Sequence, residues 1–111
     1  MQLDTLRGYL LQLTRSDAAA REAARAALLV EDEDIVAPLV AEFHAGVSEA
    51  LGVAIISLVG EIGGPDALTL LRYVYHFEDK RPAWQRAARE ALLYNQHNLD
   101  STELEDLRSS D

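Results

Sequence analysis

An internal repeat constrains this chain more than any other feature of its sequence. The segment REAARAALL at residues 21–29 is identical in six of nine positions to QRAAREALL at residues 85–93, which lies 64 residues further along. At half that distance, 32 residues, the apolar residues that begin at Ile35 match those that begin at Ala67. A period of this size is typical of helix pairs that stack and bury their apolar faces on one another.

Apolar spacing and turn residues predict that every element is a helix. Apolar residues recur at steps of three and four, and strict apolar/polar alternation never lasts long enough to indicate a strand. Asp17 and Asp34 are predicted N-caps, and Gly63 with Gly64 is a predicted stop. We expect helices over about 2–14, 18–30, 35–45, 48–62, 65–78 and 82–94.

These helices predict an all-α fold, a right-handed α-α superhelix, or solenoid, of three antiparallel helix pairs. The expected repeat domain covers residues 1–95, with repeats at about 1–30, 31–62 and 63–95. The polar tail, residues 96–111, contains Thr102 and Glu105 in the spacing of a capping box, which predicts one short helix.

The last repeat of such a stack has one side without a neighbour, and this side needs a cover. We expect the tail to provide it through Leu99, Leu104 and Leu107. The alternative is self-association through the fifth helix, which is apolar almost all round.

The segment VGEIGGPDAL, residues 59–68, resembles the turn between successive repeats of the HEAT-repeat family. The likeness is strongest to the short prokaryotic HEAT-like repeats found in phycobilisome lyases. Arg21, Ala24, Ala27 and Leu28 also fit the family's B-helix pattern of an Arg followed by small residues and Leu. The resemblance covers residues 3–95 and implies stacked pairs of A and B helices. Such arrays serve as scaffolds, as lyase subunits and occasionally as enzymes, so fold alone does not imply activity.

The sequence lacks the motifs of catalysis, and we therefore expect no enzyme activity, no cofactor and no metal site. It has no Cys, which excludes disulfides, thiolate metal sites and Cys nucleophiles. A P-loop, a Rossmann fingerprint and a nucleophile elbow are absent. HEAT-like hydroxylases bind iron through His-Glu pairs, and this sequence contains no His-Glu dipeptide. We interpret His44 and His76, which are 32 residues apart, as residues that stabilise helix C-termini.

The charge of the chain is strongly negative and concentrated in its middle. The formal net charge is −9, and eight acidic residues but no Lys or Arg lie between Ala26 and Leu71. A nucleic-acid partner would need clustered positive charge, so none is expected. A field of this sign would instead attract a basic partner. The predicted acidic surface consists of Glu31, Asp32, Glu33, Asp34, Glu42 and Glu49; the alternative is a solvated loop that also stabilises a helix N-terminus.

Stacking the B helices predicts a surface for partner binding. If Ala27, Leu58 and Ala91 are equivalent core positions, the opposite stripe holds Arg25, Ile56 and Arg89, together with Glu22, Val53 and Arg86. B helices line the concave face of HEAT-like arrays, so the resemblance implies that this stripe is an inner surface.

On that surface Val53 and Ile56 would be apolar anchors, surrounded by Arg25, Arg86 and Arg89. Arg offers planar donors at modest desolvation cost, which suits an amphipathic or acidic peptide. The alternative has the charged residues as ordinary helix-surface pairs and the two apolar residues as core.

The sequence thus predicts a non-catalytic protein-protein interaction module, a scaffold or adaptor that binds an amphipathic or acidic segment of a partner. One alternative is an accessory subunit of a bilin-lyase-like enzyme that handles a tetrapyrrole. Another is an acidic mimic that binds a basic partner.

The location of the protein is expected to be cytoplasmic. Asp4 and Arg7 interrupt the first apolar stretch, which is neither a secretory signal nor a bilayer span, and no membrane partner is expected. One Lys beside nine Arg indicates a GC-rich bacterial genome.

Overall fold

Helices make up all the regular structure of residues 2–77 and 81–109, which are the residues that the computed structural model describes. No strand occurs among them, which confirms the all-α class. The elements are α1 (Leu3–Leu13), α2 (Ala18–Val30), the 3₁₀ helix η1 (Asp32–Ile35), α3 (Val36–Ala45), α4 (Glu49–Ile62), α5 (Pro65–Phe77), α6 (Pro82–Tyr94), the 3₁₀ helix η2 (Gln96–Asn98) and α7 (Ser101–Ser109).

Local turn signals explain most of the helix boundaries. Asp17 caps α2 as predicted, since its Oδ1 accepts a hydrogen bond of 2.9 Å from the amide of Ala19. Gly63 ends α4 with a φ of 77°, a left-handed conformation that glycine adopts without strain. The expected end of the fifth helix at residue 78 lies outside the described residues.

The prediction that Asp34 caps the third helix is wrong. Asp34 lies inside η1, and α3 begins at Val36 after Ile35, which forms no side-chain cap. A 3₁₀ turn can satisfy amides at the start of a helix through bonds between residues three apart, without a capping side chain.

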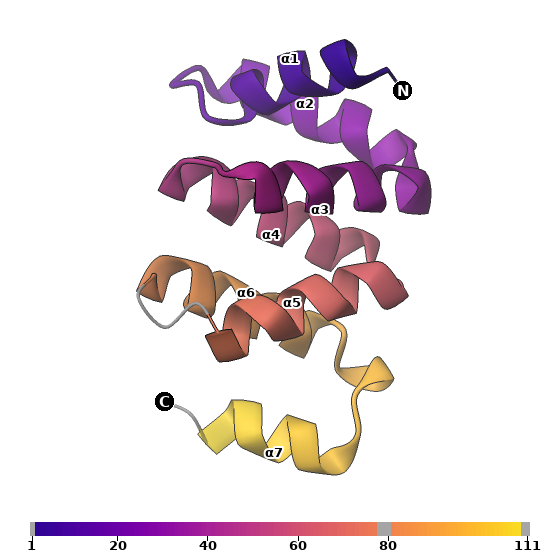
Figure 1. Cartoon of the computed structure of the whole chain (residues 1–111), viewed down its shortest axis with the longest axis vertical. Helices are drawn as coiled ribbons and strands as arrows, with labels where there is room; N and C mark the ends of the chain where they lie inside the picture. The colour runs from indigo at the N-terminus through magenta and orange to yellow at the C-terminus, as the bar shows by residue number, and fades with distance from the viewer. Residues whose placement is uncertain (1, 78–80, 110–111) are drawn as a thin grey trace.

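The helices lie in successive tiers along the longest axis of the molecule (Figure 1). The tiers are α1 with α2, α3 with α4, and α5 with α6, and α7 lies beyond the last of them. Helices α1, α3 and α5 run in one direction, and α2, α4 and α6 return in the other. The middle and last tiers contact each other through α3 with α5 and through α4 with α6, and the first tier contacts the middle one through α4 and η1.

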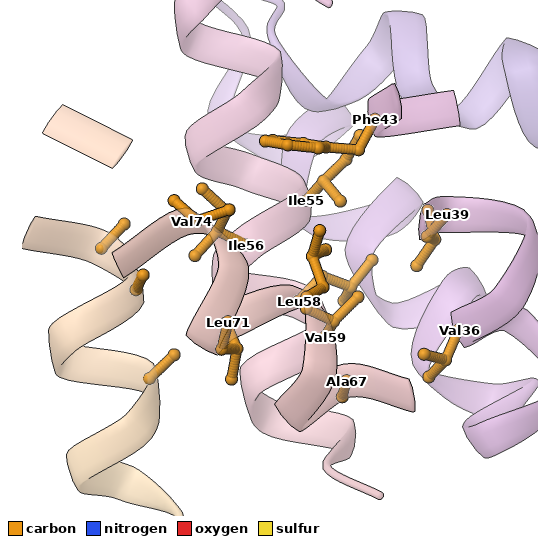
Figure 2. Close-up of a cluster of buried hydrophobic side chains, with 14 of the residues drawn as sticks. Val36, Leu39, Phe43, Ile55, Ile56, Leu58, Val59, Ala67, Leu71 and Val74 are labelled. Atoms are coloured by element: carbon orange, nitrogen blue, oxygen red, sulfur yellow. The ribbon is translucent and has the colours of Figure 1, made fainter. Parts of the chain in front are cut away.

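One apolar core runs through all tiers. Figure 2 shows side chains of α3, α4 and α5 gathered in its centre, among them Leu39, Leu58 and Leu71. The same cluster includes Leu6 of α1 and Leu107 of α7, so it joins both ends of the chain. Each such side chain contributes about 1.5–3 kcal/mol when it leaves water completely.

The closest helix contact joins α4 and α6 through glycines. A Cβ placed on Gly60 would lie 2.5 Å from the Cβ of Ala91, and a Cβ on Gly52 would overlap the indole ring of Trp84. Both positions are therefore filled by the partner helix. At Gly60 the two backbones therefore approach closely, since the added atom would also lie 3.3 Å from the Cα of Ala91, whereas at Gly52 the space is taken by the indole ring.

Two side chains fasten the ends of this contact. The indole Nε1 of Trp84 donates a 2.9 Å hydrogen bond to the carbonyl oxygen of Glu49, near the start of α4. The buried Nδ2 of Asn95 donates to the carbonyl oxygens of Gly60 and Ala91, each at 2.8 Å. Asn95 thus satisfies one of the last carbonyls of α4, which has no partner within its own helix.

The tail folds back on the last tier as α7. Leu107 is 1% exposed and packs against α6, and Leu99 and Leu104 are half-buried. The predicted capping box at Thr102 is wrong by two residues, because Asp100 is the N-cap and accepts a 2.8 Å hydrogen bond from the amide of Glu103. A carboxylate two residues earlier competes successfully for the same exposed amides.

Polar contacts add to the apolar contact of α7. Two guanidinium nitrogens of Arg72 on α5, Nε and Nη2, donate to the carboxylate of Glu103, at 2.8 and 3.1 Å. These hydrogen bonds raise the pKa of Arg72 above its usual value. Arg89 of α6 donates to the carbonyl oxygen of Leu107 at 2.8 Å.

The α4–α6 contact makes a prediction about two glycines. Gly60→Ala should lower the free energy of unfolding by about 1–3 kcal/mol, since α4 and α6 must separate. Gly8→Ala in α1, where nothing lies within 4 Å of the added methyl group, should raise it by roughly 0.5–1 kcal/mol. Urea unfolding of both variants measures the difference, and equal effects would contradict the close contact.

The packing of α7 makes a second prediction. Leu107→Ala should cost about 2–5 kcal/mol of unfolding free energy, because it leaves a cavity in the core. Arg72→Gln should cost only about 0–1 kcal/mol, since this ion pair is partly exposed. Amide hydrogen exchange of α7 should accelerate more in the first variant. Equal acceleration would mean that the ion pair holds the helix.

Candidate functional site

The predicted anchor Ile56 does not lie on the surface. Its side chain is 0% exposed and belongs to the core cluster in Figure 2. It lies between Gly52 and Gly60 at helical spacing, on the stripe of α4 that packs against α6. The expectation that Ile56 contacts a partner is therefore wrong.

The error comes from a shift of one residue in the alignment of the predicted B helices. The period of 32 matches Ile56 to Ala24 and Ala88, both of which are completely buried. The stripe above matched it instead to Arg25 and Arg89, one position further on. One residue turns a helix by about 100°, which moves a side chain from the core to the surface.

The other residues of the predicted stripe have separate environments. The guanidinium of Arg25 contacts the carboxylate of Glu61 on α4 and lies 3.8 Å from that of Glu22. Val53 is half-buried and packs against the core, and Arg86 is exposed. Arg89 is half-buried and donates its hydrogen bond to the carbonyl oxygen of Leu107 on α7. The three Arg residues therefore do not surround the predicted pair of apolar anchors on the surface, because Ile56 is inside the molecule.

The predicted acidic surface is divided between two ends of one tier. Glu31 is half-buried, and Asp32, Glu33 and Asp34 are exposed on η1, before α3. Glu49 begins α4 and thus lies near the opposite end of α3, a helix about 15 Å long. Glu42 lies 3.3 Å from the Nε of Arg7 and joins α3 to α1. Only the η1 carboxylates form a local acidic group.

A groove with a volume of about 440 Å³ lies between α3 and α5. Each helix lines it with four residues at the same spacing, namely Ala37, Val40, Ala41 and His44 on α3 and Asp66, Thr69, Leu70 and Tyr73 on α5. Small residues leave the space open. Positions spaced by three and four on two parallel helices make a straight groove.

Aromatic side chains lie at one end of the groove. The ring of His44 lies edge-on to that of Tyr73, with centroids 5.3 Å apart, and Phe77 follows at 5.6 Å from Tyr73. Tyr73 is 40% exposed and Phe77 71% exposed. Aromatic rings with this exposure are enriched at protein interfaces.

The opposite end of the groove is acidic. Asp66 also lines a second hollow of about 240 Å³, together with Glu33 and Asp34. Neither hollow has a Lys or Arg among the described residues that line it. The groove therefore changes from aromatic to acidic along its length.

A smaller hollow of about 270 Å³ lies on the other face, between α4 and α6. Its border is polar and includes Arg25, Glu61 and Glu90. Two of these charges, on Arg25 and Glu61, contact each other.

Within residues 2–77 and 81–109, His, Asp and Glu nowhere form a group of three that could hold a metal ion. None of the helices there combines the length and the apolar run that crossing a bilayer requires.

Comparison with known proteins does not add to this geometry. No protein-family model, curated protein or solved structure matches the chain. The choice of the α3–α5 groove as the candidate site therefore rests on the residues that line it.

The register correction makes a prediction about stability. Ile56→Ala should lower the free energy of unfolding by about 2–5 kcal/mol, because it removes a fully buried side chain. Arg86→Ala, at an exposed position of the same predicted stripe, should change it by less than about 0.5 kcal/mol. Thermal unfolding compares them, and a mild effect of Ile56→Ala would restore this residue as a surface anchor.

Proposed function

We propose that this protein is a non-catalytic protein-interaction module, built as a HEAT-like solenoid of three helix pairs, and that the α3–α5 groove holds a segment of its partner. The groove is the observation that carries the proposal. It combines small and apolar lining residues with exposed aromatic rings, a composition that fits a peptide better than a reactive substrate.

The repeat supports the architectural part of the proposal. Buried core positions recur 32 and 64 residues apart, as in the triplets Ala24, Ile56, Ala88 and Leu28, Gly60, Leu92. Each triplet lies on α2, α4 and α6, the second helix of each tier. Matching environments at a fixed period are what stacked repeats require.

The location of the groove differs from the surface that the sequence predicted. On the expected concave stripe, Ile56 is buried in the core and Arg25 forms an ion pair with Glu61. The tetrapyrrole alternative used the same stripe, so its apolar cleft is no longer available there. The groove between the first helices of two tiers takes the place of that stripe in the proposal.

Blocking the groove tests the proposed function. Ala41→Arg adds a long side chain to an exposed position in the groove, and Ala23→Arg adds the same side chain and charge to an exposed position of α2. Peptides selected from a displayed library of random sequences on the wild type should bind Ala41→Arg at least about tenfold more weakly, a difference of about 1.4 kcal/mol.

The control is binding to Ala23→Arg, which should stay within about twofold of the wild type because that side chain lies outside the groove. Fluorescence anisotropy measures both, and circular dichroism verifies that both variants keep their helices. Selected peptides that bind Ala41→Arg as well as the wild type would refute the groove as the binding site.

A further inference from the structure

We propose that the occupant of the α3–α5 groove is a basic amphipathic helix of a partner protein. This inference rests on the proposed function and adds the chemistry of the partner. Its apolar stripe would lie on the small and apolar residues of the groove, and its Lys or Arg side chains would face the acidic end.

The shape of the groove favours a helix as its occupant. Its walls are two parallel helices whose lining residues repeat at the same spacing, from Ala37 to His44 on α3 and from Asp66 to Tyr73 on α5. Two such ridged surfaces accept the ridge of a third helix, whose apolar residues recur at steps of three and four. The lined stretch is about 10 Å long, or two turns.

The negative charge at one end of the groove favours a partner helix with basic residues. Glu33, Asp34 and Asp66 bring three negative charges to the hollow that adjoins the groove. The N-termini of α3 and α5 each oppose them with roughly half a positive charge. The sum remains about −2, because no Lys or Arg is among the described residues that line this hollow. An acidic helix would be repelled here.

The aromatic end gives the occupant a direction. Tyr73 at the end of the groove and Phe77, one turn beyond it on α5, present exposed rings. An aliphatic or aromatic residue of the partner would bury these rings, while its basic residues lie at the other end. The partner helix is therefore apolar at one end of its stripe and basic at the other.

The experiment uses two synthetic peptides of about 16 residues, long enough for a bound helix. Both carry Leu at steps of three and four; one has Lys and the other Glu at the remaining positions near one end. The protein is the wild type, the groove pair Asp34→Asn with Asp66→Asn, or the control pair Glu105→Gln with Asp106→Asn on α7. Both pairs remove two negative charges from exposed positions.

The Lys peptide should bind the wild type, gain helical circular dichroism and bind the groove pair about tenfold more weakly. It should bind the control pair within about twofold, and its affinity should fall as salt rises. Ala41→Arg should reduce binding more than Ala23→Arg does. Equal losses in the groove and control pairs would overturn the inference, because only the overall charge would then matter.

The remaining outcomes separate this inference from the proposed function. If the Glu peptide binds as well as the Lys peptide and Ala41→Arg weakens both, the groove holds a peptide but does not select basic ones. If neither peptide responds to Ala41→Arg, both proposals are wrong. If sedimentation shows a wild-type dimer that Ala41→Arg separates, a second copy of the chain occupies the groove and the inference is wrong.

Discussion

The close approach of α4 to α6 is the constraint on which the other helices depend. Gly60 lets the two backbones approach, Gly52 leaves room for the indole ring of Trp84, and hydrogen bonds from Trp84 and Asn95 hold the ends of the contact. Since α4 also contacts α3 and α5, its position determines how the middle and last tiers meet. The α3–α5 groove is a consequence of this arrangement. The second helices of the two tiers, α4 and α6, pack closely against each other, whereas the small side chains between the first helices, α3 and α5, leave space unfilled.

Much of the fold could be predicted because its signals act locally. Gly63 and Pro65 end one helix and begin the next through backbone geometry that depends on no distant residue. The caps at Asp34 and Thr102 were mispredicted for a related reason. At the tail helix another nearby carboxylate, that of Asp100, fills the role, and at α3 a 3₁₀ turn takes the place of a capping side chain.

The candidate site could not be predicted in the same way. The position of Ile56 depended on an alignment between helices, where an error of one residue reverses inside and outside. The groove depends on which two helices become neighbours, a long-range result. A signal was nevertheless present, since Ala37, Ala41 and Thr69 are small residues on helix faces that also bear His44 and Tyr73.

The docked tail has a consequence for how a chain of this kind can grow. Leu107 and the Arg72–Glu103 pair occupy the outer side of the last tier, so this side cannot accept another helix pair. A helix pair gained by duplication would need another place, for example between two existing tiers. The inserted unit would need its own small residues where its second helix crosses the next, as Gly60 meets Ala91. The α7 helix therefore covers the side of the last tier on which a further helix pair would otherwise pack.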